Sequence, residues 1–277
     1  MYTITSSSGG AGIAYQLNQN NKNLQRSLQR LSSMKRVNSS VDDPAGLAVS
    51  MKLGVQIRKT EAVMSGMSTA SSYLQTQDGV LSTANNVLGR MAYLAQLSVG
   101  SSDSNAQAAY QVEFGNLQSQ INGMLGENFN GLALFGGDGD TTVENTDFMA
   151  ATINISGQTM SISQLDFQAV TNLAGSSGIS ITSSATAATA ASAVSSAINN
   201  LALLRATNGS EQNRINFATD LLDINKLNLE AADSRIVDLD LASEMVNFSK
   251  YTFIENAGLA LLAQANARNE KIIKLLE

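Results

Sequence analysis

One long run of regularly spaced apolar residues constrains this chain more than any other feature. It opens at Asp42-Asp43-Pro44, where Asp43 is expected to cap a helix and Pro44 to occupy its first position. Apolar and small residues then recur at alternating spacings of three and four, with only Gln77 and Ser98 off type. The ten positions are 67, 70, 74, 77, 81, 84, 88, 91, 95 and 98.

A second apolar row lies beside the first, so the buried face is wider than the seam of a two-stranded coiled coil. It consists of Tyr73, Val80, Val87 and Leu94. Because no other proline occurs in the chain, one helix can run from Ala45 to Ser98, about 80 Å at ~1.5 Å per residue. The alternative is an ordinary globular helix pair broken near Gly66 or Gly79.

The amino-acid composition limits the fold classes and the kinds of chemistry that are open to this chain. Of 277 residues, 43% are apolar but only 5% are aromatic, which suits narrow helix–helix seams better than a wide globular core. A net charge of −6 without a basic stripe argues against a nucleic-acid partner. Cysteine and histidine are both absent, which excludes their nucleophiles, His-based acid–base pairs and the usual zinc motifs. We therefore expect no enzyme activity, no cofactor and no metal site.

The ends of the chain carry no recognised targeting signal. Residues 1–10 have neither a charged n-region nor an apolar h-region, so an extracellular protein with this start would need export without a cleaved signal peptide. These ten residues are expected to be frayed. No uncharged apolar stretch of about 18 residues is seen, so no transmembrane helix is expected.

Amphipathic helices are predicted at both ends of the chain. The first starts near Ile13 and presents Leu17, Leu24, Leu28 and Leu31, interrupted by Asn20 and Asn21. The last follows Asp238-Leu239-Asp240 and carries Met245, Phe248, Leu259, Leu262, Ile273 and Leu276. Each stripe needs a partner, and we expect the two to pack on each other. We interpret the carboxylates of Asp233, Asp238 and Asp240 as a solvated helix-end cluster rather than a metal site.

The middle of the chain combines a short helix, a small β region and a second long heptad helix. After a stop near Gly100, Asp103 or Ser104 is expected to cap a helix that carries Ala108, Val112, Leu117, Ile121 and Met124. A short strand is predicted at 132–135, and alternation predicts a hairpin with strands at 151–156 and 160–163 joined by Gly157-Gln158.

The second long helix is predicted by positions spaced seven apart, with a partner row beside them. The two rows are Val194, Leu201, Asn208, Ile215, Leu222, Leu229 and Ile236, and Ala197, Leu204, Glu211, Ala218, Asn225, Ala232 and Leu239. Polar Asn208 and Glu211 mark either a register point or a local break.

Several motifs resemble those of bacterial flagellins. At the N-terminal end they are Leu31-Ser-Ser followed by Lys35–Val49, and then Asn128–Gly131; at the C-terminal end they are Ser234–Asp240, Ala242–Met245 and Leu261–Asn266. The resemblance covers roughly residues 11–136 and 190–277. Met34 stands where the family usually has Gly, which argues against a left-handed turn there.

This resemblance implies a mainly α fold: a long antiparallel coiled-coil-like helical rod with a small β-hairpin region, plus paired N- and C-terminal helices. Residues 1–42 with 238–277 would form the filament core. Residues 43–237 would form the rod, with the β region at about 130–175 and no large outer domain.

The implied function is that of a structural subunit that self-assembles into the bacterial flagellar filament for swimming motility. The self-assembly residues would be Leu17, Leu24, Leu28, Leu31, Phe248, Leu259, Leu262, Ile273 and Leu276. A hook–filament junction protein is the alternative within this class. An enzyme-bearing flagellin is disfavoured because the chain lacks His and Cys.

The resemblance further implies an extracellular location and several partners. These are other copies of the chain, an export chaperone at the C-terminal segment, and the filament cap and hook-junction proteins. A Toll-like innate receptor would contact the exposed face of the long helix through Leu88, Arg90 and Leu94, although Tyr93 replaces the usual Glu. The alternative for that face is packing within the rod and between subunits only.

Overall fold

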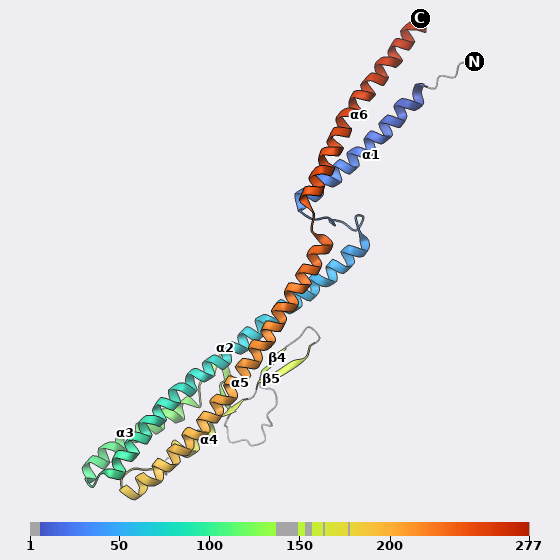
Figure 1. Cartoon of the computed structure of the whole chain (residues 1–277). Coiled ribbons are helices and arrows are strands. Elements are labelled where there is room, and N and C mark those ends of the chain that lie inside the picture. The colour runs from blue at the N-terminus through green and yellow to red at the C-terminus, as the bar shows by residue number, and fades with distance from the viewer. Residues whose placement is uncertain (1–5, 137–148, 153–156, 163, 177, 277) are drawn as a thin grey trace. The chain divides into compact units, whose positions relative to one another are not determined.

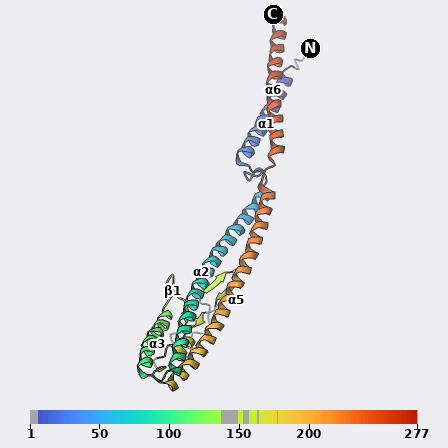
Figure 2. The same cartoon turned by 60° about the vertical axis from the view of Figure 1, so that its left-hand side comes forward.

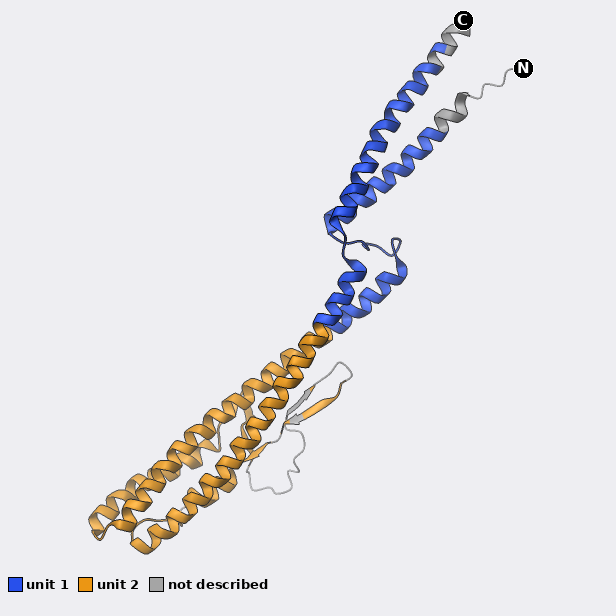
Figure 3. Cartoon of the chain, viewed as in Figure 1, with its two compact units in different colours: residues 1–57, 227–277 blue, residues 58–226 orange. Residues whose placement is uncertain are grey.

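The computed structural model describes residues 6–136, 149–152, 157–162, 164–176 and 178–276. Among them are six helices: α1 (Ser6–Ser33), α2 (Pro44–Gly100), α3 (Ser104–Met124), α4 (Gln168–Ala174), α5 (Ser184–Val237) and α6 (Leu241–Leu276). The predicted mainly α fold is confirmed (Figure 1). The chain divides into two compact units, unit 1 with residues 1–57 and 227–277, and unit 2 with residues 58–226 (Figure 3).

In the described residues of unit 2, the β region contains three two-stranded pairs. β1 (Asn128–Phe129) pairs antiparallel with β2 (Leu132–Ala133), β3 (Phe135–Gly136) pairs parallel with β6 (Leu165–Asp166), and β4 (Met149–Thr152) pairs antiparallel with β5 (Thr159–Ile162). The predicted hairpin is confirmed as β4–β5. A two-residue turn at Gly157-Gln158 is wrong, because the register pairs Thr152 with Thr159. The part of the predicted strand at 153–156 lies outside the described residues.

The core of unit 2 is centred on the heptad face of α2. All ten predicted positions are buried, and so are Tyr73, Val87 and Leu94 of the second row. Since α2 continues through Gly66 and Gly79, the alternative of a broken helix pair is wrong. The two off-type positions make polar contacts with non-helical segments: Gln77 donates to the Leu134 carbonyl at 2.7 Å, and Ser98 donates to the Ile181 carbonyl at 2.5 Å.

Within unit 2, α5 lies alongside α2 and runs in the opposite direction (Figures 1 and 2). Arg205 pairs with Asp78 at 3.0 Å and Lys226 pairs with Glu61 at 2.9 Å, so residue numbers rise along α5 as they fall along α2. The heptad residues Val194, Leu201, Ile215 and Leu222 are buried in the same core. The long antiparallel helix pair predicted from the heptads is therefore present.

A buried polar layer crosses the α2–α5 contact. The side-chain amide of Asn208 donates to Gln77 Oε1 at 2.6 Å and to the Leu74 carbonyl at 3.2 Å, and Gln212 donates to Asn208. Because α5 continues unbroken through this layer, Asn208 marks a register point rather than a break.

Tyr73 attaches the β1–β2 hairpin to this layer. Its hydroxyl donates to the carbonyls of Ala133 and Leu134, each 3.1 Å away, and its ring meets Phe129 edge-on. The hairpin turns at Asn130 and Gly131, with φ values of 51° and 82°; this is the geometry that favours an Asn-Gly pair.

Helix α3 begins as predicted but presents a different face. Asp103 caps it by accepting from the Asn105 N–H at 2.9 Å. Ala108 and Val112, predicted to be buried, are exposed, whereas Phe114 and Ile121 are in the core. Hydrogen bonds of Gln118 account for this face. Its buried side-chain amide donates to the carbonyls of Ala174, Ser176 and Ile179, which turns the Gln118 side of α3 toward that segment.

Unit 1 pairs α1 with α6, and two predictions about its N-terminal part are wrong. Helix α1 begins at Ser6, so residues 6–10 are helical rather than frayed; residues 1–5 lie outside the described residues. Met34 has a φ of 56°, the left-handed conformation that its side chain argued against. Backbone hydrogen bonds to a distant segment stabilise this conformation: the Met34 carbonyl accepts from the Leu239 N–H, and the Arg36 N–H donates to the Val237 carbonyl.

One helix meets the length and composition criterion for a membrane span. By length and composition alone, α5 is apolar enough to cross a membrane, because its first half is rich in Ala and poor in charge. In unit 2 the apolar residues Ala187, Val194 and Leu201 of this helix are buried in the core.

The environment of Tyr73 predicts how stability responds to alkaline pH. Burial, with a contribution from the charge of Glu211, raises the pKa of Tyr73 to about 12 from 10.0. The stability linked to this shift is present below pH 10.0 and is lost as the pH rises towards about 12. Tyr73→Phe should lose roughly 1–2 kcal/mol at neutral pH and show a smaller further loss at high pH. Denaturant unfolding across this range, with Tyr110→Phe as control, tests it; an unchanged alkaline loss in Tyr73→Phe would contradict it.

The left-handed turn at Met34 predicts a stabilising substitution. Met34→Gly should relieve a conformational penalty of about 1–2 kcal/mol, offset in part by the entropy that glycine adds to the unfolded chain. We expect a net gain of up to about 1 kcal/mol in denaturant unfolding. The matched control is Met51→Gly at an exposed site inside α2, which should lose about 1 kcal/mol. Destabilisation by Met34→Gly would refute the expectation.

Candidate self-assembly surfaces

The terminal helices of unit 1 meet along two rows with heptad spacing. We call these rows together the terminal seam: Ile13, Leu17, Asn20, Leu24, Ser27 and Leu31 on α1, and Glu244, Phe248, Tyr251, Glu255, Gly258, Leu262 and Ala265 on α6. Each of these residues is buried or half-buried, while most residues between them are exposed. The predicted pairing of the terminal helices is therefore present.

The most deeply buried positions of the terminal seam are polar. Asn20 donates from its side-chain amide to the Tyr251 carbonyl at 2.8 Å. Ser27 donates to Glu244 Oε1 at 2.5 Å, and both of these residues are buried. Polar groups shielded from water are tolerated here because each of these has a hydrogen-bond partner.

The outer surface of α6 is strongly apolar. Phe253 is 75% exposed and Val246 is 69% exposed. Other exposed large apolar residues of this helix are Leu241, Met245, Ile254, Leu259 and Leu261. Beside its half-buried leucines the α1–α6 pair thus buries polar groups, and it exposes large apolar side chains on its outer face, which an ordinary soluble helix pair does not.

The predicted self-assembly residues fall into three groups. Leu17, Leu24, Leu31, Phe248 and Leu262 lie half-buried in the terminal seam. Leu28 and Leu259 lie off the seam, and about half of each side chain is exposed. Ile273 and Leu276 belong to α6, but their side chains lie outside the described part of the structure.

The sequence reasoning missed Asn20, Ser27 and Glu244. The 3-4 spacing of Leu17, Leu24 and Leu31 does continue through Asn20 and Ser27, so strict spacing would have placed both on the seam. Polar side chains give no apolar signal, so hydrophobic periodicity alone does not identify them as buried.

Acidic side chains organise the helix ends of unit 1. Asp43 caps α2 as predicted, accepting from the Gly46 N–H at 2.9 Å, and a Cβ at Gly46 would stand 2.3 Å from the Asp43 carboxylate. Asp240 accepts from the N–H groups of Ala242 and Ser243 at the start of α6. Burial alone would raise the pKa of Asp42, but hydrogen bonds from Ser39 and Asn38 and the charge of Arg30 hold it below its ordinary value.

On unit 2, Arg90 forms the exposed ion pair of the predicted receptor face. Its guanidinium donates to both carboxylate oxygens of Glu113 on α3, at 2.6 and 3.0 Å, and lies 5.3 Å from the centre of the Tyr93 ring. These hydrogen bonds hold the pKa of Glu113 below its ordinary value. Leu88 and Leu94 are buried in the core of unit 2, so of the three predicted contact residues only Arg90 is at the surface.

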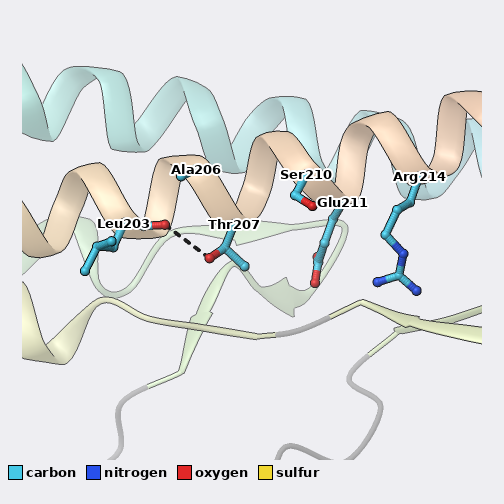
Figure 4. Close-up of a pocket in the computed structure, with 6 residues that line it drawn as sticks. All are labelled: Leu203, Ala206, Thr207, Ser210, Glu211 and Arg214. Carbon is cyan, nitrogen blue, oxygen red and sulfur yellow. Dashed lines mark hydrogen bonds between the residues drawn. The ribbon is translucent and has the colours of Figure 1, made fainter.

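A shallow hollow lies beside α5 (Figure 4). It is lined by Leu203, Ala206, Thr207, Ser210, Glu211 and Arg214. The Thr207 hydroxyl donates to the Leu203 carbonyl at 3.1 Å, and Glu211 is almost fully buried. Across the described residues no group of three or more carboxylate, imidazole or thiol side chains is placed to hold a metal ion.

Comparison with known proteins matches both ends of the chain. Residues 13–140 match the bacterial flagellin N-terminal helical region and residues 191–276 match the bacterial flagellin C-terminal helical region. A flagellin from Listeria monocytogenes is 29% identical over 270 residues, covering 94% of each chain.

Two further proteins are similar. The flagellar filament 33 kDa core protein of Treponema phagedenis is 30% identical over 270 residues, again covering 94% of each chain. The crystal structure of a Bacillus cereus flagellin is 25% identical, with a TM-score of 0.45, and the match covers 56% of this chain and 86% of that one. From the matches at both ends and the relatives along its length, this chain belongs to the bacterial flagellin family.

Proposed function

We propose that this chain is the structural subunit of a bacterial flagellar filament and that its terminal helices drive polymerisation. The observation that carries the proposal is the burial pattern of the α1–α6 pair. Its most buried residues are polar and hydrogen-bonded, and large apolar side chains of α6 are exposed to solvent. Exposed apolar surface of this kind marks a protein–protein contact. A repeated contact between copies that does not close into a ring builds a helical polymer.

The outer face of α6 can supply the necessary energy. Full burial of one Phe or Val side chain contributes roughly 1.5–3 kcal/mol relative to exposure. Phe253, Val246 and Leu261 are each more than half exposed on one helix. Their burial against neighbouring copies would stabilise every repeat of the polymer by several kcal/mol, which supports a filament subunit rather than a monomeric protein.

We assign residues 1–42 and 238–277 to the filament core and residues 43–237 to the surrounding rod layer. The segments between α1 and α2 and between α5 and α6 support these borders. The β region at about 130–175 belongs to the rod layer. No large outer domain is assigned.

The remaining expectations stay proposals that rest on family membership. We propose an extracellular position in the filament, export without a cleaved signal peptide, an export chaperone at the C-terminal segment, and contacts with the filament cap and hook-junction proteins. No catalytic role is proposed, because the chain has neither His nor Cys. A hook–filament junction protein shares the paired terminal helices; the Leu261–Asn266 motif favours flagellin over it.

A test of the filament proposal changes one exposed residue of α6. Phe253→Asp should leave the unfolding midpoint of the monomer within error, because the side chain is 75% exposed. It should abolish seeded polymerisation, since a carboxylate would enter an apolar contact at every repeat. Negative-stain microscopy and light scattering read the result. Gln264→Glu adds the same charge at an exposed position of α6 without removing apolar surface and should polymerise. Normal filaments from Phe253→Asp would count against the proposal.

We also propose that Arg90 is the contact with a Toll-like innate receptor. Arg90→Ala should lower receptor activation by the monomer while the helical circular dichroism stays unchanged, because Arg90 is an exposed residue inside α2. Glu113→Gln, which weakens the intramolecular pair but keeps the guanidinium, should preserve or raise activation. Lys59→Ala removes an exposed cation elsewhere on α2 and serves as control. Equal activation by Arg90→Ala and the control would remove Arg90 from the contact.

A further inference from the structure

The pattern of burial in unit 1 identifies residues that do more than fill space. Across the described residues of this unit, those most shielded from solvent are Asn20, Ser27, Val37, Val237 and Glu244. Val37 lies in the segment between α1 and α2, Val237 is the last residue of α5, and the three polar residues belong to the terminal seam. At the most shielded positions of the seam, therefore, hydrogen-bonded polar residues stand where leucines would bury more apolar surface.

The two hydrogen bonds of the seam share one spacing. Asn20 and Ser27 are seven residues apart on α1, and their partners Tyr251 and Glu244 are seven residues apart on α6 in the opposite sense. Both bonds therefore belong to a single antiparallel register. In that same register Gly258 lies beside Leu17, and a Cβ at residue 258 would stand 3.2 Å from Leu17 Cδ1.

Apolar heptad contacts alone do not choose between registers seven residues apart. After such a slip Leu17, Leu24 and Leu31 would again face the α6 row. The polar pair does not survive the slip: in one sense Ser27 would face Tyr251, and Glu244 would lie beyond the end of α1. In that sense both hydrogen bonds are broken, and the Ser27 hydroxyl and the Asn20 amide stay in the seam without their partners, which is unfavourable.

We propose that the Ser27–Glu244 hydrogen bond, assisted by Asn20, is a register lock that selects the one alignment of α1 and α6 competent for assembly. The inference rests on the proposed filament function and adds specificity residues to it. Register decides where the exposed Tyr15 and Leu28 of α1 stand relative to the outer apolar residues of α6. A slipped pair would present a different surface to the next copy.

The chain has no cysteine, so register can be read by disulfide cross-linking in the full-length protein. Leu17→Cys with Gly258→Cys reports the observed register. Leu17→Cys with Ala265→Cys reports a slip of seven residues along the same α6 row. Each pair is introduced into the natural background, into Ser27→Ala/Glu244→Leu, and into Glu244→Gln, which keeps an oxygen that can accept from Ser27. Intramolecular disulfide formation is timed by non-reducing electrophoresis in monomer and in seeded filaments.

In natural filaments the 17/258 pair should oxidise at least about tenfold faster than the 17/265 pair. In Ser27→Ala/Glu244→Leu the two rates should approach each other, and seeded growth should slow or give irregular polymers although the seam has become more apolar. In the separate Glu244→Gln background, the 17/258 pair should oxidise faster than the 17/265 pair, as in the natural chain. Ser32→Ala/Ser243→Leu makes similar changes at exposed neighbours and should behave as the natural chain does.

Two outcomes overturn the register lock. One is an unchanged 17/258 preference with normal growth in Ser27→Ala/Glu244→Leu. The other is equal cross-linking of both pairs in the natural filament. Failure of the natural chain to polymerise on seeds would instead refute the proposed function, and the cross-links in the monomer would still report register.

Discussion

The antiparallel contact between α2 and α5 is the constraint on which unit 2 depends. Its heptad rows bury small and medium side chains along the described length of the unit, with few aromatic residues to fill a wider core. Such a narrow seam tolerates sliding unless something defines the register. The layer of Gln77 and Asn208 does so, because a displaced amide would lose its partners in a buried environment.

The same polar layer connects the helices to the β region. Gln77 and Tyr73 both donate to carbonyls of the segment that follows β1, so the hairpin is attached where the register of the helices is set. At the other end of α2, Ser98 donates to the Ile181 carbonyl. Each interruption of the apolar row thus corresponds to a contact with backbone outside the helix pair.

The terminal helices use the same heptad spacing for a different purpose. In unit 2 polar residues are a minority within an apolar seam, whereas in the α1–α6 pair the most buried positions are Asn20, Ser27 and Glu244. Apolar side chains such as Phe253 and Val246 stand outside. A helix pair filled in this way gains little by folding alone and much by covering its outer face, as expected of a subunit of a polymer.

Local chemistry and periodicity could be deduced from the residues alone. Asp43 and Pro44 start α2, Gly100 ends it, Asp103 caps α3, and the ten-position row of α2 is buried throughout, because caps and heptads act within one helix. Other features depend on a partner distant in sequence. Met34 is held left-handed by pairing with Leu239, and α3 turns its face to suit the bonds of Gln118. The polar centre of the terminal seam belongs to the same class: periodicity specifies which face of a helix is buried, but only the opposing helix decides whether Ser27 or a leucine fits there.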